Sequence, residues 1–256
     1  MRRFDSKIVA VTGAADGIGL AAVRRFAGEG ATVVAVDTDV EALESARPEF
    51  GDAVHWVHAD VADDSTDHDW VGRTVDQFGR LDVVFLNAGI QGRLGPITDV
   101  PVEEFDRVIA VNLRGVWIGL SRSMVAMQTS GGVITITSST GGLRGSAGLA
   151  PYVASKHAVV GLMKSAALEG ARYGIRVNTL HPGGTATKML DAISSDAPAS
   201  DSKSNPAASV PLGRLADPVE MAALVAFLSS DEAGYITGST VLADGGVLAG
   251  SVPAPD

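Results

Sequence analysis

Seven short runs rich in β-branched residues recur along the chain, and helical segments separate them. Most of these runs are apolar throughout rather than alternating, which is typical of strands that helices cover on both faces. The order strand, helix, strand continues to the end of the chain. It predicts an α/β fold with a doubly wound, parallel, seven-stranded sheet and helices on both faces. The expected strands are residues 8–12, 32–36, 54–59, 82–86, 132–137, 175–180 and 240–243.

The composition fits one globular domain over residues 1–256, because no compositional break divides the chain. Hydrophobic residues make up 46% and charged residues 20%, which excludes a disordered or low-complexity chain. Cysteine is absent, so a disulfide framework and a thiolate zinc site are excluded. The net charge of −10 disfavours nucleic acid and anionic membranes as partners. No apolar run reaches the ~18 residues of a membrane span. We therefore expect a cytoplasmic protein.

Two segments depart from the alternation of strands and helices. Residues 190–211 are rich in Ser, Ala, Asp and Pro and show no clear period. They follow a strand of the parallel sheet, so they would lie over its carboxyl edge, where such sheets bind ligands. The sequence favours a substrate-covering segment within residues 184–213 over a solvated linker. The tail, residues 251–256, is expected to fray.

A glycine-rich turn follows the first expected strand. Gly13, Gly17 and Gly19 have the spacing Gly-x-x-x-Gly-x-Gly and open an amphipathic helix. Glycine permits a positive φ and a close approach of a ligand, and a helix N-terminus offers unpaired N–H groups to a pyrophosphate. This position in the chain is typical of a dinucleotide-binding turn. A tight strand-to-helix turn without a ligand is the alternative.

Asp37 follows the second expected strand, about 20 residues beyond the turn, where a carboxylate that binds ribose hydroxyls is expected. Asp16 and Asp39 add negative charge that would repel the phosphate of NADP, and no Arg or Lys lies nearby in the sequence. NAD is therefore the favoured cofactor. A turn or helix-capping role for Asp37 is the alternative, and Asp39 could serve as the cap equally well.

Tyr152 and Lys156 are four residues apart in a helical segment, so they share a face. Tyrosine has an ordinary pKa of about 10, and an adjacent ammonium would favour its phenolate and lower that pKa. The pair therefore indicates proton transfer. The alternative is an incidental tyrosine beside a lysine whose ammonium reaches solvent.

Two further polar residues, Ser139 and Asn112, are candidates for the catalytic site. Ser139 follows the fifth expected strand at the carboxyl edge of the sheet, with Ser138 and Thr140 as rivals. Asn112 lies in an otherwise apolar helical run, where its amide needs hydrogen-bond partners. It could link two elements or hold a water on a proton path.

In order along nearly the whole chain, these motifs resemble the short-chain dehydrogenase/reductase family. They are Thr12-Gly13-x-x-x-Gly17-Ile18-Gly19, Asp60-Val61, Asn87-Ala88-Gly89, Asn112, Ser138-Ser139, Tyr152-x-x-x-Lys156, Asn178 and Pro182-Gly183. The resemblance implies a Rossmann-type fold. It also implies that Tyr152 is the general acid/base and that Ser139 polarises the substrate carbonyl. Lys156 would lower the tyrosine pKa and bind the nicotinamide ribose, and Asn112 would complete a relay through water.

The resemblance also implies a cofactor-binding set. In it, Asp60 and Val61 hold the adenine, residues 87–89 form the floor of the cleft, and Thr185 and Thr187 meet the carboxamide. The whole set is Gly13, Asp16, Gly17, Ile18, Gly19, Asp37, Asp60, Val61, Asn87, Ala88, Gly89, Tyr152, Lys156, Pro182, Gly183, Thr185 and Thr187. Thr185 and His181 depart from the family's commonest residues. The family commonly forms homotetramers through the helices that contain Asn112 and Tyr152, so we expect a homotetramer, with a dimer as the alternative.

The expected substrate pocket comes from loops over the carboxyl edge and is mostly apolar. Its residues are Gln91, Leu94, Thr140, Leu143, Ser146, Leu149, Met189, Leu190 and Ile193. Such a lining favours a secondary alcohol or ketone of moderate size, including a cyclic one, over a sugar. Arg93 and Arg144 lie in the same loops and could bind a carboxylate, although exposed arginines are usually only solvated.

The expected activity is hydride transfer between NAD(H) and a secondary alcohol or ketone. A 3-oxoacyl carrier-protein reductase shares the scaffold, but it usually prefers NADPH and has a basic docking patch, whereas this chain has Asp37 and only Arg93 there. A catalytically silent NAD-sensing protein would not need the four catalytic residues. No metal site is expected, since His55 and His58 would point to opposite faces of a strand and no carboxylate cluster joins them.

Overall fold

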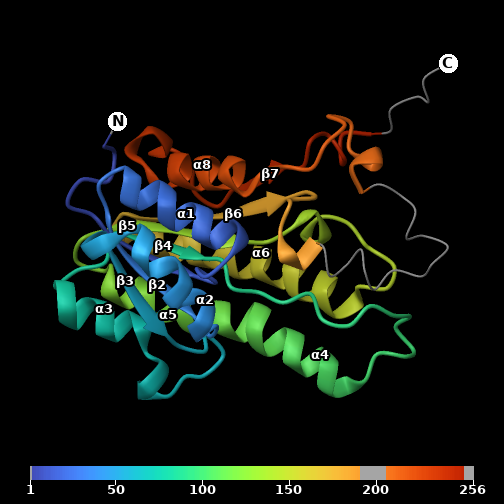
Figure 1. Cartoon of the computed structure of the whole chain (residues 1–256), viewed down its shortest axis with the longest axis horizontal. Helices are drawn as coiled ribbons and strands as arrows, with labels where there is room; N and C mark the ends of the chain where they lie inside the picture. The colour runs from blue at the N-terminus through green and yellow to red at the C-terminus, as the bar shows by residue number, and fades with distance from the viewer. Residues whose placement is uncertain (1, 191–205, 251–256) are drawn as a thin grey trace.

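A computed structural model describes residues 2–190 and 206–250. Its centre is a seven-stranded parallel sheet in the order β3-β2-β1-β4-β5-β6-β7 (Figure 1). The strands are β1 (Ile8–Thr12), β2 (Thr32–Asp37), β3 (Val54–His58), β4 (Val83–Leu86), β5 (Gly132–Thr137), β6 (Ile175–Pro182) and β7 (Thr240–Ala243). The predicted fold class is confirmed, and the expected strand limits differ from the observed ones by at most two residues.

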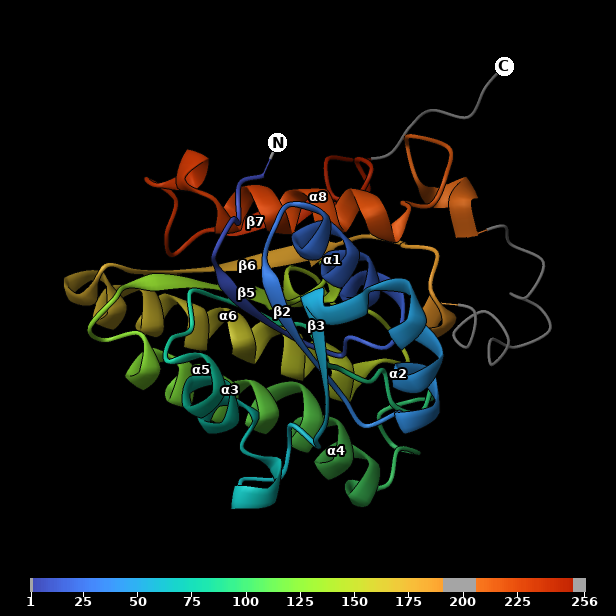
Figure 2. The ribbon, with the colours of Figure 1, turned by 60° about the vertical axis from the view of Figure 1, so that its left-hand side comes forward.

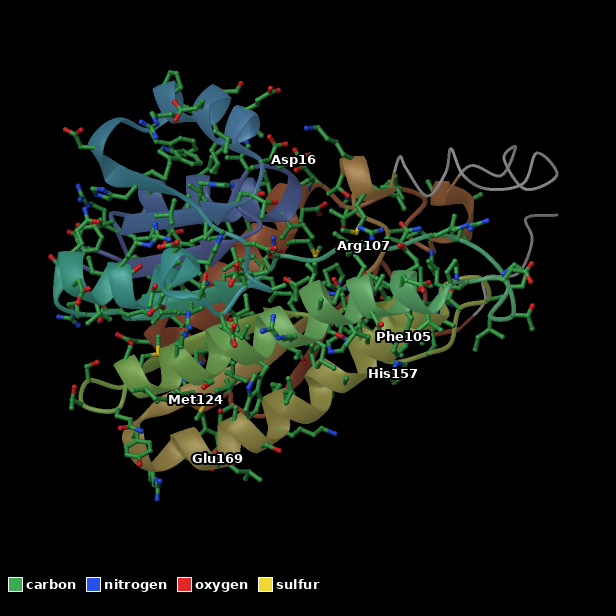
Figure 3. All side chains as sticks on the ribbon, turned by 90° about the horizontal axis from the view of Figure 1, so that it is seen from below. Asp16, Phe105, Arg107, Met124, His157 and Glu169 are labelled. Carbon is green, nitrogen blue, oxygen red and sulfur yellow. The ribbon has the colours of Figure 1, made fainter. Side chains whose placement is uncertain are left out.

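Helices cover both faces of the sheet (Figures 1 and 2). On one face lie α1 (Gly17–Gly28) and α8 (Pro218–Ser229), which pack against each other. The other face carries α3 (Trp70–Phe78), α4 (Val102–Ile109), α5 (Gly115–Ala126) and α6 (Ala150–Gly170), as the view from below shows (Figure 3). A short helix, α2 (Val40–Ala46), connects β2 to β3. None of the helices in the described ranges combines the length and hydropathy that crossing a membrane requires.

Two hydrophobic cores, one on each face, explain why the strands are apolar throughout. In β1, Ile8 and Ala10 pack into the core beneath α3, α5 and α6, whereas Val9 and Val11 pack into the core beneath α1 and α8. Successive side chains of a strand point to opposite faces, so both faces of this central strand must be apolar. The sheet thereby holds the ends of its strands at fixed positions.

The strand order reverses between β1 and β4. Chain connections run from β1 toward β2 and β3 on one side and from β4 toward β5, β6 and β7 on the other. The carboxyl ends of β1 and β4 therefore bound the crevice where open parallel sheets bind ligands.

A π-helical turn, Ala110–Arg114, joins α4 to α5. The sequence predicts a regular helix here and misses this turn. Such widened turns occur frequently at functional sites, and Asn112, which is fully buried, lies within this one.

Much of the predicted covering segment lies outside the described residues. Residues 191–205, including Ile193 of the expected substrate pocket, are not described. The tail, residues 251–256, also lies outside the described residues. At the described ends of the covering segment, Thr185 forms a parallel bridge with Ala216, and Val210 is buried.

Candidate active site

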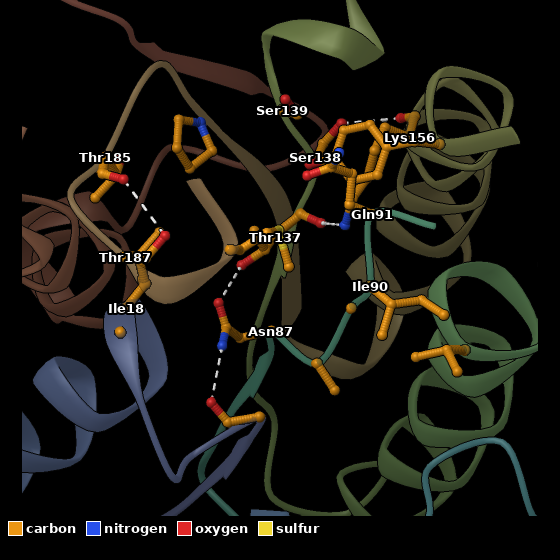
Figure 4. Close-up of a pocket in the computed structure, with 18 of the residues that line it drawn as sticks. Ile18, Asn87, Ile90, Gln91, Thr137, Ser138, Ser139, Lys156, Thr185 and Thr187 are labelled. Carbon is orange, nitrogen blue, oxygen red and sulfur yellow. Dashed lines mark hydrogen bonds between the residues drawn. The ribbon is translucent and has the colours of Figure 1, made fainter. Parts of the chain in front are cut away.

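A cavity of about 600 Å³ lies at the carboxyl ends of the strands (Figure 4). The sheet topology brings most of the predicted cofactor-binding and catalytic residues to its wall. These are Gly13, Asp16, Gly17, Ile18, Asp37, Asp60, Val61, Asn87, Ala88, Gly89, Ser139, Tyr152, Lys156, Pro182, Gly183, Thr185 and Thr187. Six of the expected substrate-pocket residues line the same cavity, namely Gln91, Thr140, Ser146, Leu149, Met189 and Leu190.

Four predicted residues lie elsewhere. Gly19 is buried beneath the glycine turn and Asn112 behind the cavity wall. Leu94 and Leu143 are not part of the lining, and Leu143 is exposed on the surface. Loop residues next to a cavity can turn toward it or away from it, and spacing alone does not decide which.

Several residues of the cavity lining are not predicted by the sequence motifs. They are Val36, Thr38, Ala59, Ile90, Val111, Thr137, Gly141, Val153, Gly184 and Lys188. Most are immediate neighbours of predicted residues, so extending each motif by one position would have found them. Lys188 is different, because its importance depends on a residue that is far away in the sequence.

The glycine turn leaves no room for side chains. A Cβ on Gly19 would lie 1.8 Å from the carbonyl oxygen of Gly13 and 2.9 Å from Nδ2 of Asn87. Gly13 has a φ of +64°, and Asn87 Nδ2 donates a hydrogen bond to its carbonyl at 3.2 Å. Thr137 in turn donates to Asn87 Oδ1 at 3.0 Å, so side-chain hydrogen bonds join the ends of β1, β4 and β5 (Figure 4).

The carboxylate of Asp37 is fixed beside the turn. Its Oδ2 accepts a hydrogen bond from the Ala15 N–H at 3.0 Å, and its Oδ1 accepts from Thr38 and Asp39 at 2.7 and 3.1 Å. The cap of α2 is Asp39, which accepts from the Ala42 N–H. The helix-capping alternative for Asp37 is therefore wrong, whereas the turn role is observed, since Asp37 Oδ1 accepts from the N–H two residues further on.

A lysine that is remote in the sequence lies beside the glycine turn. Lys188 Nζ is 3.4 Å from Asp16 Oδ2, and both side chains are exposed. The expectation that no basic residue offsets the acidic group at this end of the cleft is therefore wrong. That expectation covered only residues that are close in the sequence. The segment after β6 is distant in the sequence but lies next to the glycine turn in the folded chain.

The structure distinguishes the two serines that follow β5. Ser138 is buried, and its hydroxyl donates to the carbonyl oxygen of Lys156 at 2.9 Å. Ser139 Oγ accepts from the Gly141 N–H at 3.0 Å and interacts with the Tyr152 hydroxyl so as to lower its pKa. The hydroxyl beside the tyrosine therefore belongs to Ser139.

Burial controls the ionisation of Tyr152 and Lys156. It raises the pKa of Tyr152, because a phenolate loses its hydration, and the hydrogen bond with Ser139 opposes this only in part. Burial also lowers the pKa of Lys156 to about 8. The ammonium lies 5.6 Å from the centre of the tyrosine ring and donates to the Thr137 carbonyl at 2.9 Å. Burial therefore opposes the lowering of the Tyr152 pKa expected from the Lys156 ammonium, and it favours the protonated phenol.

Asn112 links two elements at the back of the site. Its Oδ1 accepts from the Ile90 N–H at 2.8 Å, and its Nδ2 donates to the Ile90 carbonyl at 2.7 Å and to Ser155 Oγ at 3.1 Å. These bonds tie the loop after β4 to α6, which carries Tyr152. The linking role is thus observed, and the water-holding role stays a prediction.

His181 supports the Ser139 backbone from below. Its ring is fully buried, with Nδ1 2.8 Å from the Ser139 carbonyl oxygen and Nε2 2.9 Å from Thr179 Oγ1. A carbonyl oxygen only accepts, so Nδ1 carries a proton. Burial lowers the pKa of His181, which makes the neutral imidazole the stable form. Among residues 2–190 and 206–250, no group of three His, Cys, Asp or Glu side chains could hold a metal ion.

Lys156→Met should stabilise the protein at pH 7 while removing the ammonium from the site. The folded-state pKa of about 8 lies below the ordinary 10.5, so folding penalises the charged form. This penalty is fully present below pH 8 and disappears as the pH rises from 8 to 10.5. The variant also loses the hydrogen bond of the ammonium, which offsets part of this effect. We therefore expect its free energy of unfolding to rise by about 1–2 kcal/mol at pH 7.

Denaturant unfolding of wild type and Lys156→Met at pH 7 and pH 9.5 measures this effect. The difference in free energy of unfolding between the variant and the wild type should be smaller at pH 9.5 than at pH 7. Lys164→Met, on an exposed position of the same helix, should show neither effect. A wild type that is more stable than Lys156→Met at pH 7 would contradict the predicted burial cost.

Comparisons with known proteins agree with this geometry. A family profile described as enoyl-(acyl carrier protein) reductase matches residues 13–248. Levodione reductase of Leifsonia aquatica is 37% identical over 253 residues, which cover 95% of each chain. A 3-alpha-(or 20-beta)-hydroxysteroid dehydrogenase of Mycobacterium tuberculosis (strain ATCC 25618 / H37Rv) is 39% identical over 249 residues, covering 97% of this chain and 92% of the relative.

Solved structures show the same similarity. The crystal structure of levodione reductase has a TM-score of 0.91 at 37% identity, over 96% of this chain and 99% of the other. A 3-ketoacyl-(acyl-carrier-protein) reductase from Brucella melitensis, complexed with NADH, has a TM-score of 0.87 at 34% identity, over 95% and 98%. The fold and site thus define a nicotinamide-dependent oxidoreductase. The chain belongs to the short-chain dehydrogenase/reductase family, which confirms the resemblance seen in its motifs.

Proposed function

We propose that this protein transfers hydride between NAD(H) and a secondary alcohol or ketone of moderate size, including cyclic ones. The observation that carries the proposal is the convergence of Ser139, Tyr152 and Lys156 on one cavity that also holds the glycine turn. Two relatives, named as a levodione reductase and a hydroxysteroid dehydrogenase, support it.

The residues present fit a dinucleotide. Asp16 precedes α1 without capping it through its side chain, so the first N–H groups of the helix stay available to a pyrophosphate. Gly17 has a φ of +53° and Gly13 one of +64°, which leaves the backbone open to close approach. In this proposal Asp37 binds the adenosine ribose, and Asp60 and Val61 hold the adenine. Bound NAD(H) supplies or accepts the hydride.

The proton chemistry is assigned to Tyr152. Its raised pKa keeps the phenol protonated at neutral pH, which is the form that donates a proton to a carbonyl oxygen during reduction. Ser139, which interacts with the Tyr152 hydroxyl, would orient and polarise the same oxygen. Lys156 would bind the nicotinamide ribose, and Asn112 would hold the water that completes the proton path.

The substrate would occupy the end of the cavity lined by Leu149, Met189 and Leu190. We propose one catalytic domain over residues 1–256, with residues 184–213 covering the substrate. A 3-oxoacyl carrier-protein reductase is the second candidate, favoured by the solved reductase of that class. That structure is complexed with NADH, so the substrate, not the cofactor, distinguishes the two candidates.

We also propose that the protein works as a homotetramer in the cytoplasm. Large apolar side chains are exposed on α4, α5 and α6, whose shared face is seen in Figure 3. Phe105 is 43% exposed, Trp117 57% and Leu168 82%. Burying these side chains between subunits would remove apolar surface from water.

Absorbance of NADH tests the proposed function. The purified protein should form NADH from NAD and a panel of secondary and cyclic alcohols, with little activity on sugars or with NADP. Activity confined to NADPH and 3-oxoacyl thioesters would replace the proposal by the second candidate. Tight NADH binding without turnover of any alcohol or ketone would indicate an NAD-sensing protein.

Asp37→Ala should weaken the preference for NAD over NADP. Removing the carboxylate abolishes its repulsion of the NADP phosphate and its bond to the ribose, so the ratio of kcat/KM values should fall about tenfold or more. Asp39→Ala is the matched comparison. It removes an equal charge that also repels the phosphate, but Asp39 caps α2 instead of binding the ribose, so this change should lower the ratio less. If the two variants keep the wild-type ratio, Asp37 does not select the cofactor.

A further inference from the structure

The charges that line the cavity are separated along its length. The carboxylates of the lining, Asp16, Asp37 and Asp60, follow β1, β2 and β3, at the end assigned to the adenosine. The loops after β4 and β5, which line the other end, contribute no carboxylate to it. Within the described part of the chain, the substrate end therefore lacks a group that would repel an anion.

Arg144 brings a positive charge to this end. It follows the short turn that begins after Ser139, and its backbone N–H donates to the Thr140 carbonyl at 3.1 Å. Among the residues that the structure describes, no carboxylate forms an ion pair with its guanidinium. The other two cations of the lining differ, because Lys188 pairs with Asp16 and Lys156 is buried.

The structure distinguishes Arg144 from Arg93 as a ligand-binding candidate, whereas the sequence places both in loops over the same edge of the sheet. Both arginines are exposed, but only Arg144 is part of the cavity lining. Its backbone N–H donates to Glu104 Oε1, and its charge acts on the same carboxylate. Glu104 forms its ion pair with Arg107, and Arg93 lies outside the cavity, so Arg144 is the arginine available to a ligand within it.

Gln91 adds a second donor to the same cavity. Its Oε1 is enclosed and has no hydrogen-bond partner. Its Nε2 has no partner among the described residues either, but it is not enclosed. The amide therefore offers N–H groups on its open side, and a guanidinium and an amide N–H group both require an acceptor.

We propose that the substrate carries a carboxylate, which binds Arg144 and Gln91 while the carbonyl or carbinol carbon reacts beside Tyr152. The inference rests on the proposed function and narrows its substrate class to keto acids and hydroxy acids with an apolar body. A carboxylate accepts several hydrogen bonds at once and pairs strongly with a guanidinium. Reduction consumes one hydride and one proton per carbonyl group, and the carboxylate is unchanged.

A matched pair of substrates tests the proposal: 3-oxocyclohexanecarboxylate and its methyl ester, each with NADH. The wild type should prefer the acid in kcat/KM. Arg144→Ala should lower kcat/KM for the acid about 10- to 100-fold more than for the ester. Arg144→Gln should act in the same direction, which guards against a folding defect of one variant. Arg93→Ala is the matched control and should keep the wild-type preference.

Calorimetry gives a readout that does not need turnover. Cyclohexanecarboxylate should bind the complex of wild-type protein and NADH in a 1:1 ratio. Arg144→Ala should abolish this binding, and Gln91→Leu should weaken it. Equal kcat/KM values for acid and ester, with no carboxylate binding, would overturn this inference and leave the proposed function standing. Failure of both ketones with NADH would instead count against the proposed function, and the calorimetry would still decide whether Arg144 binds a carboxylate.

Discussion

Tyr152→Phe should reduce turnover by about 10²–10⁴-fold while NADH binding is retained. The substitution removes only the phenolic hydroxyl, which is the proton donor beside Ser139, and it keeps the ring that lies next to the Lys156 ammonium. Ser139 Oγ still accepts from the Gly141 N–H, so the local backbone should stay in place. Steady-state kinetics and a fluorescence titration with NADH measure the two quantities.

Tyr235→Phe is the matched control for this experiment. Tyr235 is fully exposed and does not line the cavity, so the loss of its hydroxyl should leave turnover unchanged. Wild-type turnover in Tyr152→Phe would refute the assignment of the general acid. A loss of NADH binding that parallels the loss of turnover would instead place the defect in the cofactor site.

Gly19→Ala is the second change with a large expected effect. The new methyl group would lie 1.8 Å from the Gly13 carbonyl oxygen, which is backbone and cannot rotate away. The glycine turn must therefore move, and we expect a stability loss of about 1–3 kcal/mol together with a large loss of NADH affinity. Thermal unfolding and NADH titration check both effects.

Gly28→Ala, at the end of the same helix, is the control. A Cβ at Gly28 meets no atom within 4 Å, so alanine should be neutral or stabilising by up to about 1 kcal/mol. An NADH affinity for Gly19→Ala equal to that of Gly28→Ala would contradict the role assigned to the turn. The pair thus separates the cost of the added atom from the general effect of replacing glycine in a helix.

The strands and the helical pair Tyr152/Lys156 could be predicted because their signals are local. A strand of a two-sided parallel sheet must be apolar on both faces, which Ile8 to Val11 show in four consecutive residues. Residues four apart on a helix share a face regardless of what surrounds them. The glycine spacing is local in the same sense, since a tight turn excludes side chains wherever it occurs.

Other features of the site depended on contacts between distant segments. Spacing could not show that Ser139 rather than Ser138 lies beside Tyr152, because the choice is made by the carbonyl of Lys156, which binds Ser138. It could not show that Lys188 reaches Asp16, since the segment after β6 must fold back over the turn.

The direction of the Tyr152 pKa shift was also a tertiary property. Sequence reasoning weighed the neighbouring ammonium, whereas the cost of burying a phenolate depends on how completely surrounding elements exclude water. The same holds for Arg93 and Arg144, which have similar places in the sequence but different environments. The fold and the types of residue at the site follow from local signals in the sequence, because periodicity and short spacings act over a few residues. Which side chains meet and how they ionise depends on burial and long-range contacts, which exist only once the chain is folded.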